Sequence, residues 1–283
     1  MSKRIIKKEA HIIAKMKYDS WLDASYRLYQ GQLIFSQDTT SERLHTNVTS
    51  LKKTLRKYLT IDSSQLIAAD LRNSQPFMSL AFLNPNLSKD IDRIIEGHLS
   101  DLKKNHHTEY LKLKTLLSNI RAGLIPSDVT NYIQDVVSGK LYDNMAINWT
   151  RATGIKITRE MAKERVFKIF FQPPRFMDKL KKEFIRVYPT MWQIISLVNT
   201  GFIRVGSGQN SFAKILQNIE SFLFLDIACI GLKSGLPNVP LITVHDSIAT
   251  LPRYVSIVET ILGVVLHKAL GHSPTINLED WST

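Results

Sequence analysis

The stretch LITVHDSIAT, residues 241–250, joins a short apolar strand to an aspartate at its end. The same combination occurs much earlier, where LIAAD at residues 66–70 ends on Asp70. An apolar strand buries its side chains, so a terminal carboxylate is costly unless it is solvated, paired or bound to metal. If the two strands lie side by side, Asp70 and Asp246 could share divalent metal, and their oxygen atoms suit Mg²⁺. Each aspartate could instead cap the turn or helix that follows it.

A predicted helix at residues 158–172, TREMAKERVFKIFFQ, carries two cations and then two aromatic residues at a strict spacing of four. Side chains at positions i and i+4 share one face of a helix, so these four lie along one stripe. They are Arg159, Lys163, Phe167 and Phe171. Cations so arranged can hold a triphosphate, and a ring further along can stack on a base or close off a sugar. An amphipathic helix with its phenylalanines in the core and its cations in solvent explains the same pattern.

The composition restricts the class of protein. The chain has 283 residues, 44% of them hydrophobic and 22% charged, which excludes collagen-like, low-complexity and fully disordered classes. Its 37 lysines and arginines outnumber 25 acidic residues and give a net charge of +12, so nucleic acid is the first expected partner. The single cysteine, Cys229, excludes an internal disulfide framework and a cysteine-rich zinc site.

The remaining stretches indicate a largely helical, soluble protein. Further helices are predicted at residues 3–30, 175–187, 211–233 and 252–270. The C-terminal residues 271–283, GHSPTINLEDWST, are polar and are expected on the surface. The most apolar stretch, residues 219–232, contains Glu220 and Asp226 and falls short of about 18 uninterrupted apolar residues. The charged N-terminus lacks the apolar segment of a secretory signal, so we expect a cytoplasmic protein without membrane contact.

Together these motifs resemble family A polymerases, which include DNA polymerase I-like enzymes and phage-type single-subunit RNA polymerases. Residues 158–172 are similar to motif B, written R-x3-K-x3-F-x3-Y-G in the DNA polymerase I-like enzymes. Residues 241–250 are similar to motif C, and their His-Asp-Ser followed by Thr is especially similar to the phage-type RNA polymerases. Residues 66–77, LIAADLRNSQPF, resemble motif A, with an apolar strand, an aspartate and a Ser-Gln pair.

Two further segments extend the resemblance over roughly residues 40–255. Residues 40–51, TSERLHTNVTSL, resemble the T-x-R-L-S-S segment that touches the primer–template in DNA polymerase I-like enzymes. Residues 214–228, KILQNIESFLFLDIA, resemble the helix that carries a template-contacting glutamine. All five elements stand in the family order.

The resemblance implies an α+β fold: a right-hand polymerase-like palm on a small antiparallel sheet, mainly helical fingers, and no complete thumb or exonuclease domain. The implied parts are a basic helical segment at residues 1–40, a candidate for a reduced thumb; palm with motif A at 41–85; helical fingers with motif B at 86–190; and palm with motif C at 191–283.

The resemblance also implies catalytic and metal-binding roles. Asp70 and Asp246, with the carbonyl of Leu71, would bind two Mg²⁺ ions, with Mn²⁺ as a substitute. Lys163 would help to hold the triphosphate and could protonate the pyrophosphate leaving group. His245 would position the primer end.

For the substrates, the resemblance implies that Arg159 holds the triphosphate beside Lys163, that Phe167 packs against the sugar and that Phe171 stands at the base. Gln75 falls in register with the glutamate that excludes a ribose hydroxyl in the DNA enzymes. The residues implied to contact primer–template are Arg43, His45 and Gln217.

Departures from the motifs leave the sugar preference open. Gln172 replaces the glycine that follows the motif B tyrosine, and Pro173 then ends the helix. Phe171 lacks the hydroxyl that phage-type RNA polymerases use to accept a ribose hydroxyl, so the site has less basis for selecting ribose. Gln75 stands where the DNA enzymes carry a glutamate. We expect dNTPs as the preferred substrate.

The expected function is template-directed nucleotidyl transfer to a 3′-OH, as in DNA polymerases, with replication or priming of a mobile element or phage as a possible setting. The alternatives are a single-subunit RNA polymerase or primase-like enzyme, and a catalytically silent nucleic-acid-binding protein. An accessory protein could supply the missing thumb.

Overall fold

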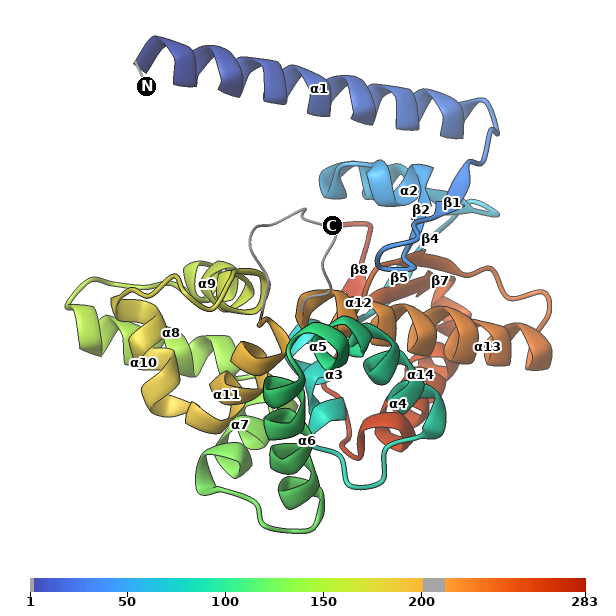
Figure 1. Ribbon diagram of the computed structural model, residues 1–283. Coiled ribbons are helices and arrows are strands. Elements are labelled where there is room, and N and C mark those ends of the chain that lie inside the picture. The colour runs from blue at the N-terminus through green and yellow to red at the C-terminus, as the bar shows by residue number, and fades with distance from the viewer. Residues whose placement is uncertain (1–2, 201–211) are drawn as a thin grey trace.

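The computed structural model describes residues 3–200 and 212–283 and shows a mixed α+β fold, mostly helical with small antiparallel sheets (Figure 1). The α-helices are α1 Lys3–Tyr29, α2 Asn47–Ser50, α3 Ser74–Met78, α4 Lys89–His98, α5 Ser100–Asn105, α6 His107–Arg121, α7 Ser127–Val137, α8 Leu141–Thr153, α9 Arg159–Phe171, α10 Lys179–Val187, α11 Pro189–Val198, α12 Phe212–Ser221, α13 Ile230–Gly235 and α14 Val255–Leu270. The strands are β1 Phe35–Gln37, β2 Leu44–Thr46, β3 Thr60–Ile61, β4 Ser64–Gln65, β5 Ile67–Leu71, β6 Ile242–Val244, β7 Ser247–Thr250 and β8 Ile276–Asp280. Short 3₁₀ helices cover Lys53–Tyr58, Ser79–Phe82 and Pro252–Tyr254, and a π-helical segment covers Phe222–Cys229.

The largest sheet among the described residues has the strand order β6-β7-β5-β8, with antiparallel neighbours throughout. The apolar run of β5 follows from its central place, because the strand is covered on both faces. Ala69 and Leu71 belong to the main hydrophobic core, whereas Ala68 packs into a smaller cluster on the opposite face. The predicted strand is therefore correct in position, but it continues through Asp70 to Leu71 instead of ending on the aspartate.

The motif C stretch forms a hairpin and not a single strand ending on Asp246. His245 and Asp246 are the two turn residues between β6 and β7, and Val244 pairs with Ser247 across the turn. His245 has a φ of 52°, a left-handed conformation that is uncommon for a residue with a side chain. A two-residue connection needs positive φ to follow the twist of the strands, which explains why the chain reverses here.

The C-terminal residues 271–283 lie mostly at the surface, as expected, but they include an edge strand that the sequence did not predict. Residues Ile276–Asp280 form β8, which pairs with β5 so that Asn277 lies opposite Asp70. Trp281 follows and is buried, with its backbone N–H donating to the carbonyl of Leu66. Pairing to β5 satisfies the backbone of this polar sequence, and that contact is set by the fold and not by its own hydrophobic pattern.

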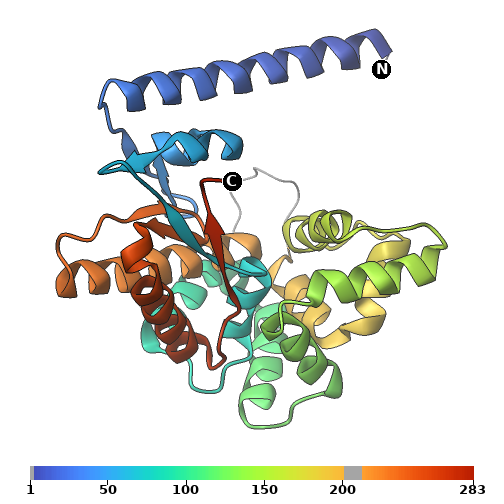
Figure 2. The same cartoon turned by 180° about the vertical axis from the view of Figure 1, so that it is seen from behind.

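The helices carry most of the core. The main hydrophobic cluster joins β5 to residues such as Trp149 of α8, Phe170 of α9 and Phe212 of α12. The predicted helices over 3–30, 158–172, 175–187, 211–233 and 252–270 are all present with small shifts at their ends. Figures 1 and 2 show α1 lying along one side of the molecule, where it packs on α2.

A continuous helix spans α12, the π-helical segment and α13, from Phe212 to Gly235. It is the one helix in the described part of the chain that is long and apolar enough to cross a membrane, and 56% of its apolar window is buried in the protein. The sequence predicts no membrane-spanning stretch here, because Glu220 and Asp226 interrupt the apolar run. A core helix has the same composition, which fits its buried position.

Candidate active site

A cavity of about 410 Å³ gathers most of the predicted site residues. Its walls are formed by Arg43, Lys53, Asp70, Leu71, Arg72, Asn73, Ser74, Gln75, Tyr142, Arg159, Lys163, Phe167, Phe171, Gln217, Glu220, His245, Asp246 and Asn277. Every residue predicted to be catalytic, nucleotide-binding or metal-ligating is in this set, and so are Arg43 and Gln217 of the predicted nucleic-acid contacts. His45 is the exception, although its ring centroid lies 6.4 Å from that of His245.

Asp70 lies in β5, and Asp246 lies in the turn that leads into the neighbouring strand β7. Asp70 lies opposite Ser247 in the β5–β7 ladder, and the N–H of Leu71 donates to the carbonyl of Asp246 at 3.0 Å. Neither residue caps a helix in the described part of the chain, because Asn73 is the N-cap of α3 and β7 follows Asp246. Neither aspartate is therefore a helix cap, although Asp246 does lie in a turn, the other position that this alternative allowed.

Burial and crowding make both carboxylates unfavourable as anions. Burial, and then the charges of Glu220 and Asp70, raise the pKa of Asp246 to about 7. Burial and the charge of Glu279 also raise the pKa of Asp70. Lys163 acts in the opposite direction on both groups. Burial is the first cause for both groups, so each carboxylate would be stabilised as an anion by a bound cation.

The α9 stripe faces the cavity from the other side. Thr158 caps the helix by accepting the N–H of Met161 at 3.3 Å, which fixes the start of the stripe at Arg159. Phe167 makes edge-to-face contacts with two other rings. Its ring centroid lies 5.8 Å from that of Phe171 and 6.4 Å from that of Tyr142. The buried core face of the helix is supplied by other residues, Ala162, Val166, Ile169 and Phe170. Phe171 is partly buried against that core, yet the stripe as a whole lines the cavity.

Glu220 of α12 is a central residue of the cavity that no sequence motif indicated. It is only 1% exposed, and it accepts hydrogen bonds from three side chains. Its Oε1 accepts from Arg43 at 2.6 Å and 3.1 Å, and its Oε2 accepts from Ser74 at 2.5 Å and from Gln75 at 2.8 Å. Glu220 therefore ties residues 40–51, the motif A segment and α12 together at the cavity wall. The signal available in the sequence was an acid inside a strongly apolar helix.

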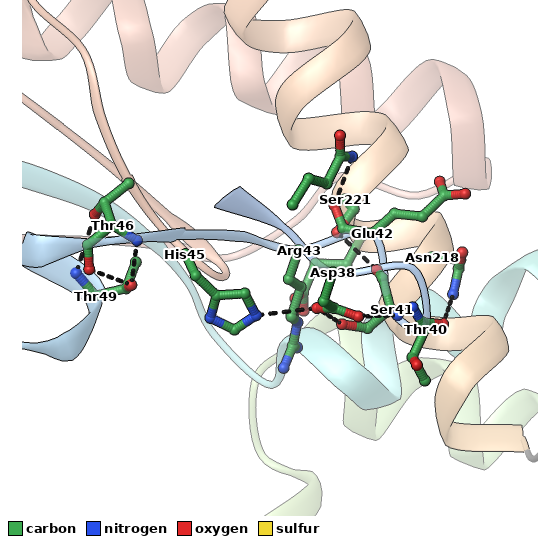
Figure 3. A network of polar contacts seen from close by, with 12 residues as sticks. Asp38, Thr40, Ser41, Glu42, Arg43, His45, Thr46, Thr49, Asn218 and Ser221 are labelled. Atoms are coloured by element: carbon green, nitrogen blue, oxygen red, sulfur yellow. Dashed lines mark hydrogen bonds and ion pairs between the residues drawn. The ribbon is translucent and has the colours of Figure 1, made fainter. Parts of the chain in front are cut away.

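The hairpin that carries Arg43 is itself fixed by a polar network (Figure 3). Asp38 accepts hydrogen bonds from the backbone N–H groups of Thr40 and Ser41, from the Ser41 hydroxyl and from His45 at 3.0 Å. Although burial acts to raise it, these bonds hold the pKa of Asp38 well below its usual range.

Two side chains of α12 complete the attachment. Asn218 donates to the carbonyl of Thr40 at 3.0 Å, and Ser221 donates to that of Ser41 at 3.1 Å. Both α12 and the Asp38 network therefore orient the β1–β2 hairpin, which explains how Arg43 reaches the cavity while His45 stays beside it.

His245 lies at the hairpin turn next to Asp246. Partial burial, and then the positive charge of Arg43, lower the pKa of His245. The imidazole is therefore neutral near pH 7, and a neutral ring can accept or donate a hydrogen bond without adding charge.

The donor set decides which metal would fit. The described residues contain no group of three or more His, Cys, Asp or Glu side chains in a metal-binding arrangement. Two carboxylates and a backbone carbonyl are nonetheless hard oxygen ligands, and Mg²⁺ commonly keeps water and substrate oxygens in its remaining positions. The cavity wall also carries five cationic and three acidic side chains, which suits an anionic substrate arriving with a metal ion.

Comparison with known proteins finds similarity to solved structures and not to family models or curated sequences. No protein-family model matches the sequence, and no curated protein matches it. Among solved structures, the chain matches the POL domain of Pol1 from M. smegmatis, a family A polymerase determined in complex with a DNA primer-template and dNTP. The match has a TM-score of 0.41 and 12% identity, and covers 89% of this chain and 48% of that one. The chain thus spans about half the length of that domain.

Proposed function

We propose that this protein is a template-directed nucleotidyltransferase that adds nucleotides to a 3′-OH, as DNA polymerases do. The observation that carries the proposal is one cavity that holds two aspartates, one in β5 and one in the turn before β7, together with the cationic and aromatic stripe of α9. Carboxylates that hold metal, cations that hold phosphate and rings that stack on a base are the groups that this reaction needs.

In this proposal Asp70 and Asp246, with the carbonyl of Leu71, hold Mg²⁺. Two bound ions would supply Lewis-acid stabilisation of the attacking and leaving oxygens. The raised pKa values of both aspartates fit the role, because a carboxylate pair without a cation is poorly stabilised as an anion.

The α9 stripe binds and orients the nucleotide. Arg159 and Lys163 hold the triphosphate, and the Lys163 ammonium donates a proton to the pyrophosphate oxygen as that oxygen gains charge. Phe167 packs against the sugar and Phe171 against the base. Tyr142 touches Phe167 edge to face, which keeps that ring in place.

The primer–template lies along the hairpin side of the cavity. Arg43, whose guanidinium is held by Glu220, contacts the backbone of the primer–template. Gln217 contacts the template. His245, with His45 near it, positions the primer end. In terms of parts, β5–β8 form the palm and α8–α10 belong to the fingers.

The proposed sugar preference is for dNTPs. The amide nitrogen of Gln75 is engaged by Glu220, and Phe171 offers no hydroxyl to a ribose. A ribose hydroxyl gains little from such a site, because discrimination in its favour requires a polar partner.

Primer extension tests the proposal. The full chain is given a labelled primer–template and Mg²⁺, with dNTPs and NTPs in separate reactions, alongside Asp246→Asn. The matched control is Asp226→Asn, an exposed acid of the same C-terminal half that lies outside the cavity. Extension by the wild type and by Asp226→Asn, lost in Asp246→Asn, is the expected result. Tight nucleic-acid binding with no extension by the wild type would favour a binding protein instead.

A further inference from the structure

Arg72 lines the cavity but has no role in the proposed nucleotidyl transfer. It stands two positions after Asp70, and its side chain is 33% exposed. Its described ionic contact is a long one, from Nη2 to Oδ2 of Asp143 at 3.5 Å. The buried Nε has no hydrogen-bond partner among residues 3–200 and 212–283. A buried N–H group without an acceptor is costly, so a ligand that accepts a hydrogen bond from this Nε would stabilise the site.

Arg159 meets the same carboxylate oxygen. Its Nε lies 3.5 Å from Oδ2 of Asp143, without a hydrogen bond to any described residue, and its guanidinium lies 5.4 Å from the Tyr142 ring. A guanidinium has five N–H donors, so one shared oxygen leaves most donors of the two arginines free. A partly exposed ion pair at this distance also contributes little stability. The two guanidinium groups therefore converge on one carboxylate oxygen, and most of their N–H donors have no acceptor there.

The backbone is shaped to admit Arg72. Gly139 precedes α8, and a Cβ atom built there would lie 2.6 Å from Cδ of Arg72 and 2.8 Å from its Nε. Its φ of +70° also favours glycine. With a larger residue at position 139, the Arg72 side chain would have to shift.

A phosphate group is the ligand that best fits two converging guanidinium groups. Each planar fork can donate two parallel hydrogen bonds to phosphate oxygens, and a phosphate offers more acceptors than the single oxygen of Asp143 now shared. Arg159 is the first residue of the stripe and Lys163 the next, so a triphosphate that follows the stripe ends beside Arg159.

We propose that Arg72 and Arg159 together bind the terminal phosphate of a nucleoside triphosphate, and that Arg72 makes the site discriminate triphosphates from diphosphates. The nucleotide part of this inference rests on the proposed function. Recognition of a polyphosphate by the arginine pair does not require that the protein polymerises.

Calorimetric titration of the full chain in Mg²⁺ tests the inference. The probes are inorganic tripolyphosphate, dATP and dADP, and the variants are Arg72→Gln and Arg151→Gln, an exposed arginine of α8 outside the cavity. One lost charge-assisted contact predicts that Arg72→Gln weakens dATP and tripolyphosphate binding about 10- to 100-fold. Binding of dADP should change less than about threefold, and Arg151→Gln should match the wild type.

A second pair of variants alters the position of Arg72 without removing its charge. Gly139→Ala should displace Arg72 and reproduce the selective loss of dATP binding. Gly154→Ala is its matched control, since that glycine has a φ of +73° and no neighbour within 4 Å of the added Cβ. The control separates backbone strain from displacement of the arginine.

The outcomes distinguish this inference from the proposed function. Arg72→Gln that binds dATP within twofold of the wild type would overturn it, and so would equal losses for dATP and dADP. Selective loss would support it even if primer extension failed. Extension unaffected in rate and KM by Arg72→Gln would overturn it while leaving the proposed function intact.

Discussion

Glu220 and Asp246 are two acids of one cavity with opposite surroundings. Glu220 is almost fully buried, yet Arg43, Ser74 and Gln75 together give it four hydrogen bonds. Asp246 lacks such compensation, and burial beside two other carboxylates raises its pKa to about 7. A buried charge that is fully paired holds a structure together, whereas one that is left short of partners marks the place for a ligand.

The largest expected effect concerns Lys163, the cation that faces the under-compensated aspartates. Lys163→Met should lower nucleotide incorporation about 10²- to 10⁴-fold, because it removes both a phosphate contact and the proposed general acid. Lys168→Met, an exposed lysine of the same helix outside the cavity, should keep near wild-type rates. Single-turnover incorporation measures both, and equal rates in the two variants would remove Lys163 from the chemistry.

The next effect concerns stability. Glu220→Gln should lower the free energy of unfolding by about 3 kcal/mol, because it leaves Arg43 without its buried counter-charge. Asp90→Asn breaks the exposed pair with Arg93 and should cost less than about 0.5 kcal/mol. Denaturant titration of both variants checks the difference. Glu220→Gln as stable as the wild type would mean that the network is not structural.

Replacement of Asp246 should raise the free energy of unfolding instead of lowering it, and the gain should depend on pH. The folded protein keeps a proton on Asp246 up to about pH 7, whereas an unfolded aspartate loses it near 3.8. Folding therefore binds a proton in this window, and the stability of the metal-free protein falls as pH rises through it. Asp246→Asn should be more stable than the wild type by about 1–2 kcal/mol at pH 8 and nearly equal at pH 4. Thermal melts in EDTA measure this, and a less stable variant at pH 8 would be evidence against crowding of the carboxylates.

The smallest effect sharpens the description of the Glu220 network. Ser74→Ala removes one of its four hydrogen bonds and should cost about 1–2 kcal/mol, less than loss of the carboxylate itself. The measurement is again denaturant titration. A cost equal to that of Glu220→Gln would show that Ser74, and not Arg43, supplies most of the compensation.

The features predicted from sequence were those with a local pattern. The spacing of four along α9 fixes which side chains share a face once the residues are helical. The apolar runs before Asp70 and before His245 identify the strands β5 and β6 from their composition alone. These patterns need no knowledge of distant contacts.

The features that were missed depend on tertiary packing. Glu220 was noted only as a charge that interrupts an apolar stretch, since its partners lie about 145 to 177 residues away in the chain. The β8 strand has a polar sequence whose role is created by the exposed edge of β5. Arg72 gains its place from Gly139, a contact that spacing within a motif does not reveal.

Direct measurement of metal binding tests the central claim that the under-compensated aspartates, and not the paired glutamate, form the reactive end of the cavity. Mn²⁺ can be titrated into the full chain with a nucleoside triphosphate and followed by its electron paramagnetic resonance signal. We predict binding by the wild type and by Glu220→Gln, studied below its melting temperature, and loss of binding in Asp246→Asn. Equal Mn²⁺ affinity in the wild type and Asp246→Asn would contradict the account.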